Sequence, residues 1–249
     1  MSRQMPFDKL AKKYDEYRPR YPQELVQYVV EGTKTNPRVV DCGSGTGIVL
    51  EWLLPYLSFP ETYAVDISEG MISGGKSKFP QVNWIVGSIE DVLDDLEPAD
   101  LIVAGQAYQW FNRKKFLQKA SSNLTDNGKI AIIQNNRDYF TNIMLAEYES
   151  LLESMSPGYV RNYRNIDIKK ELFDWVDLPN LTVKDYNYSW KREVQIEDFV
   201  GMSSSSTQVQ RAIDAHGADF LDHVRNIAVK HSYNGKVILN YTTQLFIAR

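Results

Sequence analysis

The chain has 249 residues, of which 43% are hydrophobic and 24% are charged, and its formal net charge is −4. This length is sufficient for one large domain with a complete hydrophobic core. The slightly acidic balance argues against a nucleic-acid-binding protein, because it implies no dominant positive field. The single cysteine, Cys42, excludes an intrachain disulfide framework, and the three scattered histidines predict no metal site.

The N-terminal segment MSRQMPFDKLAKKYDEY lacks the apolar stretch of a signal peptide. No apolar run elsewhere approaches the length needed to span a bilayer. We therefore expect a cytoplasmic protein that contacts neither membrane nor nucleic acid, and that exists as a monomer or homodimer.

The first half of the chain alternates apolar runs rich in β-branched residues with segments of helical spacing. The runs predict buried strands over residues 38–42, 62–67, 82–87, 99–104 and 129–134. The segments between them predict helices over residues 48–57, 68–79, 90–96 and 113–124. This alternation implies parallel strands joined by right-handed crossovers.

The second half changes character. It predicts a helix over 139–155, a strand over 181–190 and further helical stretches around the serine run 203–206. Alternating apolar residues over 235–249 predict a long final strand. One α/β sheet with insertions fits this pattern better than two separate domains.

The stretch VVDCGSGTGIV, residues 39–49, places three glycines between a strand and a helix. Open parallel sheets bind ligands at such strand ends. A dinucleotide fingerprint would require glycine where the chain has Ile48, and a phosphate-binding P-loop would require a lysine that is absent. The carboxylate of Asp41 favours an ammonium-bearing ligand over a pyrophosphate.

A second acid, Asp66, ends the next strand about 20 residues further on, where a carboxylate accepts hydrogen bonds from ribose hydroxyls. An acid near a helix start is also favoured by the helix dipole alone. Because Asp66 occurs in the same chain as the glycine loop, we prefer the interpretation that Asp66 binds a ribose. Ser68 is positioned to cap the helix that follows.

Four motifs, VVDCGSGTG, VDISEGM, GSIEDV and ADLIVAGQAYQWF, follow one another in this order. In this order they resemble the class I S-adenosylmethionine-dependent methyltransferases. More narrowly, they resemble the small-molecule group that includes trans-aconitate methyltransferase. The resemblance covers the first 135 residues well, and YDEYRPRYP (14–22) and the terminal strand more loosely.

The resemblance implies a Rossmann-like, doubly wound, seven-stranded α/β sheet that is mostly parallel, with an antiparallel last strand and a helical cap insertion. It implies a single domain over residues 1–249. Within it we expect an N-terminal helical lid over about 1–35 and a cofactor-binding core over about 36–135. An insertion and substrate-side cap would cover about 136–230, before the terminal strand at about 235–249.

The implied cofactor is S-adenosylmethionine, with S-adenosylhomocysteine as its product. The resemblance implies that the methionine portion is held by Asp41, Gly43, Ser44 and Gly45. It further implies that Asp66 binds the ribose, and that the adenine meets Ile67, Met71, Ser88, Ile89 and Glu90. Ser88 replaces the acid usual in the family. Met71 is favoured as an adenine contact because a flexible thioether packs well on aromatic faces, with ordinary helix core as the alternative. Tyr14 and Arg18 would close the site, and Gln106 is a further candidate contact.

Gln109 stands where relatives often have a histidine before the tryptophan, which removes an obvious general base. The candidates for the substrate side are Arg18, Tyr21, Tyr108, Gln109 and Trp110. Transfer from a sulfonium depends mainly on positioning, and a carboxylate acceptor needs a cation rather than a base. We therefore expect a small-molecule acceptor, with a carboxylic acid as one candidate. Two alternatives stay open: an NAD-type oxidoreductase, and a catalytically silent S-adenosylmethionine-binding protein.

Overall fold

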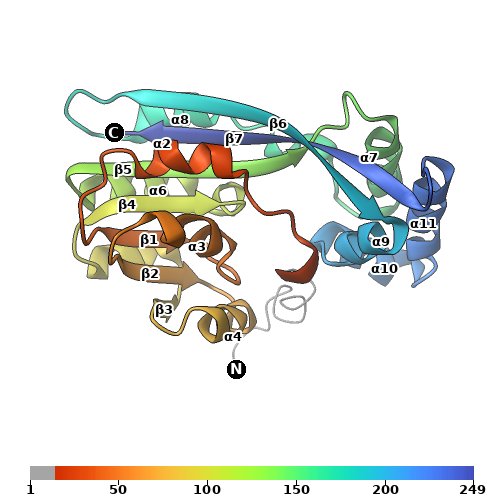
Figure 1. The fold of residues 1–249 in the computed structure, drawn as a ribbon, viewed down its shortest axis with the longest axis horizontal. Coiled ribbons are helices and arrows are strands. Elements are labelled where there is room, and N and C mark those ends of the chain that lie inside the picture. Colours follow the sequence, from red (N-terminus) through yellow and green to blue (C-terminus); the bar gives the residue numbers. More distant parts are fainter. Residues whose placement is uncertain (1–14) are drawn as a thin grey trace.

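A computed structural model describes residues 15–249, apart from the side chains of Tyr163 and Arg164. The chain forms a seven-stranded sheet with helices on both faces, and a helical cap extends from one end of it (Figure 1). The strands, in spatial order, are β3 (Asn83–Val86), β2 (Glu61–Asp66), β1 (Arg38–Cys42), β4 (Ala99–Gly105), β5 (Leu124–Arg137), β7 (Lys236–Ala248) and β6 (Val183–Gln195).

The first five strands pair in parallel, whereas β7 is antiparallel to both β5 and β6. This arrangement confirms the predicted doubly wound sheet with an antiparallel last strand. The chain leaves β1 in one direction along the sheet and returns to its other side at β4. The carboxyl ends of β1 and β4 therefore flank the point at which open α/β sheets bind ligands.

Alternating side chains of the central strands fill the cores on the two sheet faces. Ala131 and Ile133 join the cluster beneath α2 (Val26–Val30) and α3 (Ile48–Leu53). Ile130 and Ile132 join the opposite cluster, which contains residues of α5 (Ile89–Val92), α6 (Arg113–Ser122) and α8 (Ile168–Trp175). The remaining helix of the sheet lobe, α4 (Glu69–Lys78), packs against β2 and β3. The alternating residues of the last strand are all buried: Val237, Leu239, Tyr241, Thr243, Leu245 and Ile247.

Local sequence explains where several helices begin and end. Ser68 accepts a hydrogen bond from the Met71 main-chain N–H, so it caps α4 as expected. The helix predicted over 48–57 is shorter, because it passes into the 3₁₀ turn Leu54–Tyr56, which contains a proline. The helix predicted over 139–155 begins only at α7 (Ile143–Met155), where Asn142 caps it.

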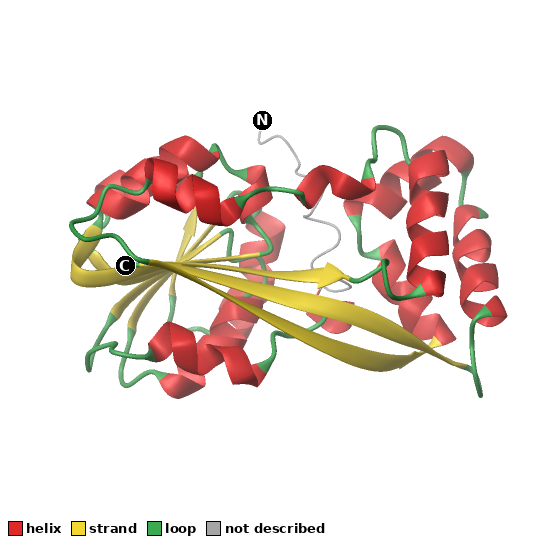
Figure 2. Cartoon of the chain, turned by 90° about the horizontal axis from the view of Figure 1, so that it is seen from above, coloured by secondary structure: helices red, strands yellow, loops and turns green. Residues whose placement is uncertain are grey.

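The cap is built from α7 and from α9 (Ile196–Ser204), α10 (Thr207–His216) and α11 (Phe220–Lys230). β6 and β7 run beyond the sheet lobe and into this cap (Figures 1 and 2). The insertion expected over 136–230 is not one continuous cap, because α8 and β6 return to the sheet. Ile168 and Leu172 of α8 are buried in the core that covers one face of that sheet.

Candidate active site

A cavity of about 310 Å³ lies at the carboxyl ends of the parallel strands. Loops after β1, β2, β3 and β4 form its walls, and Arg18 and the start of α10 complete it. The predicted site residues that line it are Arg18, Gly43, Gly45, Asp66, Ile67, Met71, Ser88, Ile89, Glu90, Gln106, Gln109 and Trp110. A smaller space of about 30 Å³, whose wall shares several of these residues, is also lined by Ser44 and Tyr21.

The glycine loop leaves space for a ligand at one particular residue. Gly43 and Gly45 both have positive φ angles, +68° and +54°. A Cβ atom on Gly43 would lie 2.4 Å from the Cβ atom of Ala107, so Gly43 is required for internal packing. A Cβ atom on Gly45 would meet no protein atom within 4 Å. Gly45 is therefore the position where a ligand can approach bare backbone.

Asp66, at the end of β2, is hydrogen-bonded to the glycine loop that follows β1. Its carboxylate accepts hydrogen bonds from the main-chain N–H groups of Gly45 and Ser68, each at 2.8 Å. Next to it in the wall, Ile67 is half exposed and Met71 is buried. The cavity thus presents a fixed carboxylate between an apolar side chain and the glycine loop.

Ser88 and Glu90 form the wall that follows β3. The Ser88 hydroxyl donates to Glu90 Oε2 at 2.6 Å, and Glu90 Oε1 accepts from the Asn112 main-chain N–H at 2.6 Å. These bonds fasten the loop after β3 to the start of α6. The main chain of Ile89 runs between them, and its side chain is buried.

Asp41 and Ser44 are polar groups without partners beneath the loop. Asp41 has no exposed surface, and among the described residues neither carboxylate oxygen has a hydrogen-bond partner. Burial raises the pKa of Asp41 well above its usual range, and the negative charge of Asp66 raises it further. The Ser44 hydroxyl is also buried and unpaired within residues 15–249. Ser44 lines the smaller space, whereas Asp41 lines neither space, so the structure does not bring this predicted contact into the cavity wall.

Two glutamines after β4 have fixed orientations. Gln106, which has a φ of +56°, donates through Nε2 to the Asn135 carbonyl at 2.8 Å. Gln109 Nε2 donates to the Gln106 carbonyl at 2.8 Å. Main-chain carbonyls only accept hydrogen bonds, so each amide nitrogen is assigned unambiguously. The two amide oxygens are buried without a partner in the described part of the chain.

Tyr108 and Tyr21 do not occupy the positions expected for substrate contacts. Tyr108 is fully buried, and its hydroxyl donates to Glu171 Oε2 at 2.6 Å. The 3₁₀ turn Tyr108–Trp110 directs Tyr108 into the core, whereas Trp110 lines the cavity and is 58% exposed. Tyr21 packs on Trp52, with ring centroids 5.6 Å apart, and reaches only the smaller space.

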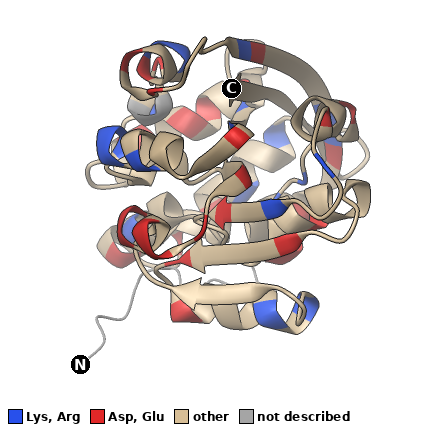
Figure 3. Cartoon of the chain, turned by 90° about the vertical axis from the view of Figure 1, so that its left-hand side faces the viewer, with Lys and Arg blue, Asp and Glu red and all other residues tan. Residues whose placement is uncertain are grey.

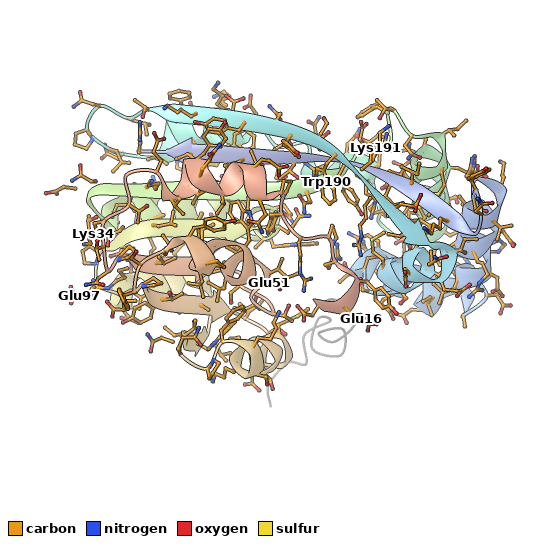
Figure 4. The ribbon with its side chains drawn as sticks, in the orientation of Figure 1. Glu16, Lys34, Glu51, Glu97, Trp190 and Lys191 are labelled. Atoms are coloured by element: carbon orange, nitrogen blue, oxygen red, sulfur yellow. The ribbon has the colours of Figure 1, made fainter. Side chains whose placement is uncertain are left out.

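Residues 15–21 form a strap between the sheet lobe and the cap. Asp15 Oδ1 accepts from Lys78 Nζ at 2.6 Å and from the Thr46 hydroxyl at 3.0 Å. On the other side, Arg192 donates to the Tyr17 carbonyl at 3.2 Å. Figure 4 shows Glu16 of this strap beside the cap helices and Glu51 on α3.

The strap places its two arginines differently. Arg18 lines both the main cavity and the smaller space. Arg20 instead pairs with Glu51 Oε1 at 3.0 Å and with Asp15. The remaining N-terminal candidate, Tyr14, lies outside the described residues.

The cap contributes two residues that the sequence did not single out, Thr207 and Gln208 at the start of α10. The serine run before them supplies the local reason for their position. Hydroxyls of Ser203 to Ser206 donate to nearby main-chain carbonyls, and Ser206 accepts from the Val209 N–H. The run therefore forms the junction between α9 and α10 that brings Thr207 to the cavity.

Two features of residues 15–249 bear on other classes of function. No group of three or more His, Cys, Asp or Glu residues is arranged to hold a metal ion in this part of the chain. None of its helices has both the length and the apolar character required to cross a bilayer. Basic and acidic residues are interspersed on the face opposite the cavity (Figure 3).

Comparison with known proteins finds methyltransferases. A family model described as "Methyltransferase domain" matches residues 39–128. An uncharacterised methyltransferase of Schizosaccharomyces pombe is 27% identical over 201 residues, which cover 80% of this chain and 77% of the yeast protein. Malonyl-[acyl-carrier protein] O-methyltransferase 2 of Ilyobacter polytropus is 31% identical over 178 residues, 68% of this chain and 66% of that protein. Several other curated relatives align over about half of their own length.

A solved structure has the same fold. It is that of a protein from Anaeromyxobacter dehalogenans described as a type II methyltransferase, with a TM-score of 0.67 and 21% identity. The match covers 93% of this chain and 97% of that one. These comparisons favour a methyltransferase over the alternative of an NAD-type oxidoreductase. The matched domain, the methyltransferase relatives and the shared fold support a class I S-adenosylmethionine-dependent methyltransferase.

Proposed function

We propose that this protein transfers a methyl group from S-adenosylmethionine to the carboxylate of a small organic acid, which yields a methyl ester and S-adenosylhomocysteine. We infer the chemical class of the methyl acceptor from the charge of the cavity wall. Arg18 is the only cationic side chain lining the cavity among residues 15–249, and no histidine or lysine of that part of the chain lines it.

The residues around the glycine loop suit the cofactor. The unpaired hydroxyl oxygen of Ser44, which lines the smaller space, can accept a hydrogen bond from an ammonium group, and Gly45 leaves room for close approach. Asp66 and the half-exposed Ile67 suit a ribose and an aromatic base, respectively. When bound, S-adenosylmethionine supplies an electrophilic methyl group, so the chain itself has mainly to bind and orient the two reactants.

The acids of the wall are poorly suited to act as general bases. Asp66 already accepts hydrogen bonds from two main-chain N–H groups, and Glu90 accepts from Ser88 and Asn112. An amine or phenol acceptor can require proton removal, whereas a carboxylate is already ionised. A carboxylate instead requires a donor that holds it in line with the methyl group, and a guanidinium is well suited to this role.

The remaining wall residues have supporting roles in this proposal. Gln109 and the exposed Trp110 line the part of the cavity that lies outside the smaller space at the glycine loop. They are therefore the side chains best placed to limit the shape of the acceptor. The name of the Ilyobacter relative, an O-methyltransferase for a malonyl group, supports methylation at oxygen.

The proposal is tested in two steps. Calorimetry with S-adenosylhomocysteine and with NAD should show binding of the first alone. A turnover assay with tritiated S-adenosylmethionine over acids, phenols and amines should then label the acids. Trans-aconitate belongs in the panel, because the narrower family group is still a prediction. Cofactor binding without turnover of any acceptor would instead favour the catalytically silent alternative. The cytoplasmic location and the oligomeric state also stay predictions.

A further inference from the structure

Gly201 lies in the interior of α9, where no turn requires a glycine. Glycine is one of the least favourable residues inside a helix, because its backbone loses more freedom on folding than that of any other residue. Its presence is explained where another group comes too close to the helix for a side chain to fit. The strap supplies such a group.

The strap lies beside α9 (Figure 1), and the ring of Tyr17 is the group that approaches Gly201. A Cβ atom on Gly201 would lie 2.6 Å from Tyr17 Cζ, 2.9 Å from Cε1 and 3.0 Å from Cε2. All three distances are shorter than carbon–carbon van der Waals contact, which begins at about 3.5 Å. Tyr17 also packs against the hydrophobic core of the cap, and its carbonyl accepts from Arg192 at 3.2 Å. The missing side chain of Gly201 therefore lets the strap attach to the cap.

Arg18 follows Tyr17 and lies between two attachments of the strap. At the other end, Tyr21 is buried and packs on Trp52 of the sheet lobe. Arg18 also precedes Pro19, and the residue before a proline is restricted to extended backbone. The place where Arg18 enters the cavity wall therefore depends on where Tyr17 is held.

The ion pairs of the strap cannot replace its attachment to the cap. They join Asp15 to Lys78 and Arg20 to Glu51, and both partners lie on helices of the sheet lobe. The four side chains are between 28% and 43% exposed, and ion pairs of this kind contribute little to stability. When the strap leaves the cap, these pairs hold it only weakly, and Arg18 can leave the cavity wall.

We propose that Tyr17 and Gly201 are positioning residues, which hold Arg18 in the cavity wall where it meets the acceptor carboxylate. The role of Arg18 rests on the proposed function, whereas the attachment of the strap to α9 does not depend on it. A strap that is attached in only a fraction of molecules leaves only that fraction ready to bind the acid. The KM for the acid then rises by the inverse of that fraction, while kcat is unchanged because bound acid keeps the strap in place.

Electron–electron double resonance of the full-length chain without ligand tests the attachment. Nitroxide labels are placed at two exposed positions, Glu16→Cys on the strap and Asp214→Cys on α10, in a Cys42→Ala background that contains no other thiol. We expect one narrow distance distribution, which Gly201→Ala should broaden because the added methyl group displaces the ring. Tyr17→Ala should broaden it equally. Tyr17→Phe, the matched control that keeps the ring, should leave it narrow.

Initial rates with tritiated S-adenosylmethionine test the consequence for acceptor binding. For trans-aconitate and every other acid of the panel that the wild-type protein methylates, Gly201→Ala should raise the KM and leave kcat unchanged. The rise is about tenfold if one molecule in ten keeps the strap attached. In an Arg18→Ala background, Gly201→Ala should cause no further rise, because its effect is exerted through Arg18.

A distance distribution that stays narrow in Gly201→Ala, or a KM that does not change, would overturn the inference. If urea unfolding shows that Gly201→Ala does not fold, Tyr17→Ala, which changes no residue of α9, decides by the same two measurements. A broadened distribution in Gly201→Ala, together with no turnover of any acid by the wild-type protein, would support the attachment of the strap and contradict the proposed function.

Discussion

Replacing Gly45 by alanine separates ligand binding from folding. The added methyl group would meet no protein atom within 4 Å, so its cost to the fold comes only from the positive φ of +54°. A residue with a side chain in this left-handed conformation costs about 1–2 kcal/mol. If the methyl group occupies space that the cofactor needs, binding should lose about a further 1–3 kcal/mol, or roughly 5- to 150-fold in affinity.

Gly43→Ala is the matched control. It carries a similar φ strain, but its Cβ atom would lie 2.4 Å from that of Ala107, so it should destabilise the fold clearly more than Gly45→Ala. Urea unfolding gives the two stabilities, and calorimetry with S-adenosylhomocysteine gives the affinity of Gly45→Ala. Wild-type affinity in a folded Gly45→Ala protein would refute the placement of the ligand against this loop.

The remaining predictions concern Asp66, Tyr108 and Asp100. Asp66→Ala should weaken S-adenosylhomocysteine binding by about 1.5–3 kcal/mol in calorimetry, and unchanged affinity would remove Asp66 from the site. Tyr108→Phe removes the bond to Glu171, so it should lose about 1 kcal/mol in urea unfolding without a change in turnover, and a loss of turnover would contradict the core position. The pKa of Asp100 is lowered, because hydrogen bonds from the Arg38 N–H, Lys34 and Thr125 outweigh the effect of burial. Its stabilising contribution is therefore present at neutral pH and disappears as pH falls below about 4. Asp100→Asn should be less stable at neutral pH and lose less stability on acidification, and parallel pH profiles would contradict this.

The residues of the cofactor half of the cavity could be predicted from the sequence because short, local motifs mark them. A strand, a glycine loop and a helix follow one another within residues 38–53, and this order fixes where Gly45 lies. Asp66 could be found for the same reason, since it ends the next parallel strand and both carboxyl ends meet at one edge of the sheet.

The residues of the acceptor half were harder to predict from the sequence, because their positions depend on tertiary packing. A single 3₁₀ turn decides that Tyr108 enters the core and Trp110 the cavity wall, and both residues are aromatic, so composition does not distinguish them. Thr207 reaches the cavity only because α9 and α10 pack in the cap, more than 90 residues after β4. No motif marks such a contact, although the serine run marks the helix junction next to it.

The most direct test of the account is the chemical stability of the methylated product. After incubation with tritiated S-adenosylmethionine and the acid panel, the product is treated with mild alkali, which hydrolyses methyl esters but leaves methyl amines and methyl ethers intact. If the acceptor is a carboxylate, the label is released as volatile methanol. Label that remains in an alkali-stable product would contradict the carboxylate acceptor and indicate methylation at nitrogen, carbon or a hydroxyl oxygen.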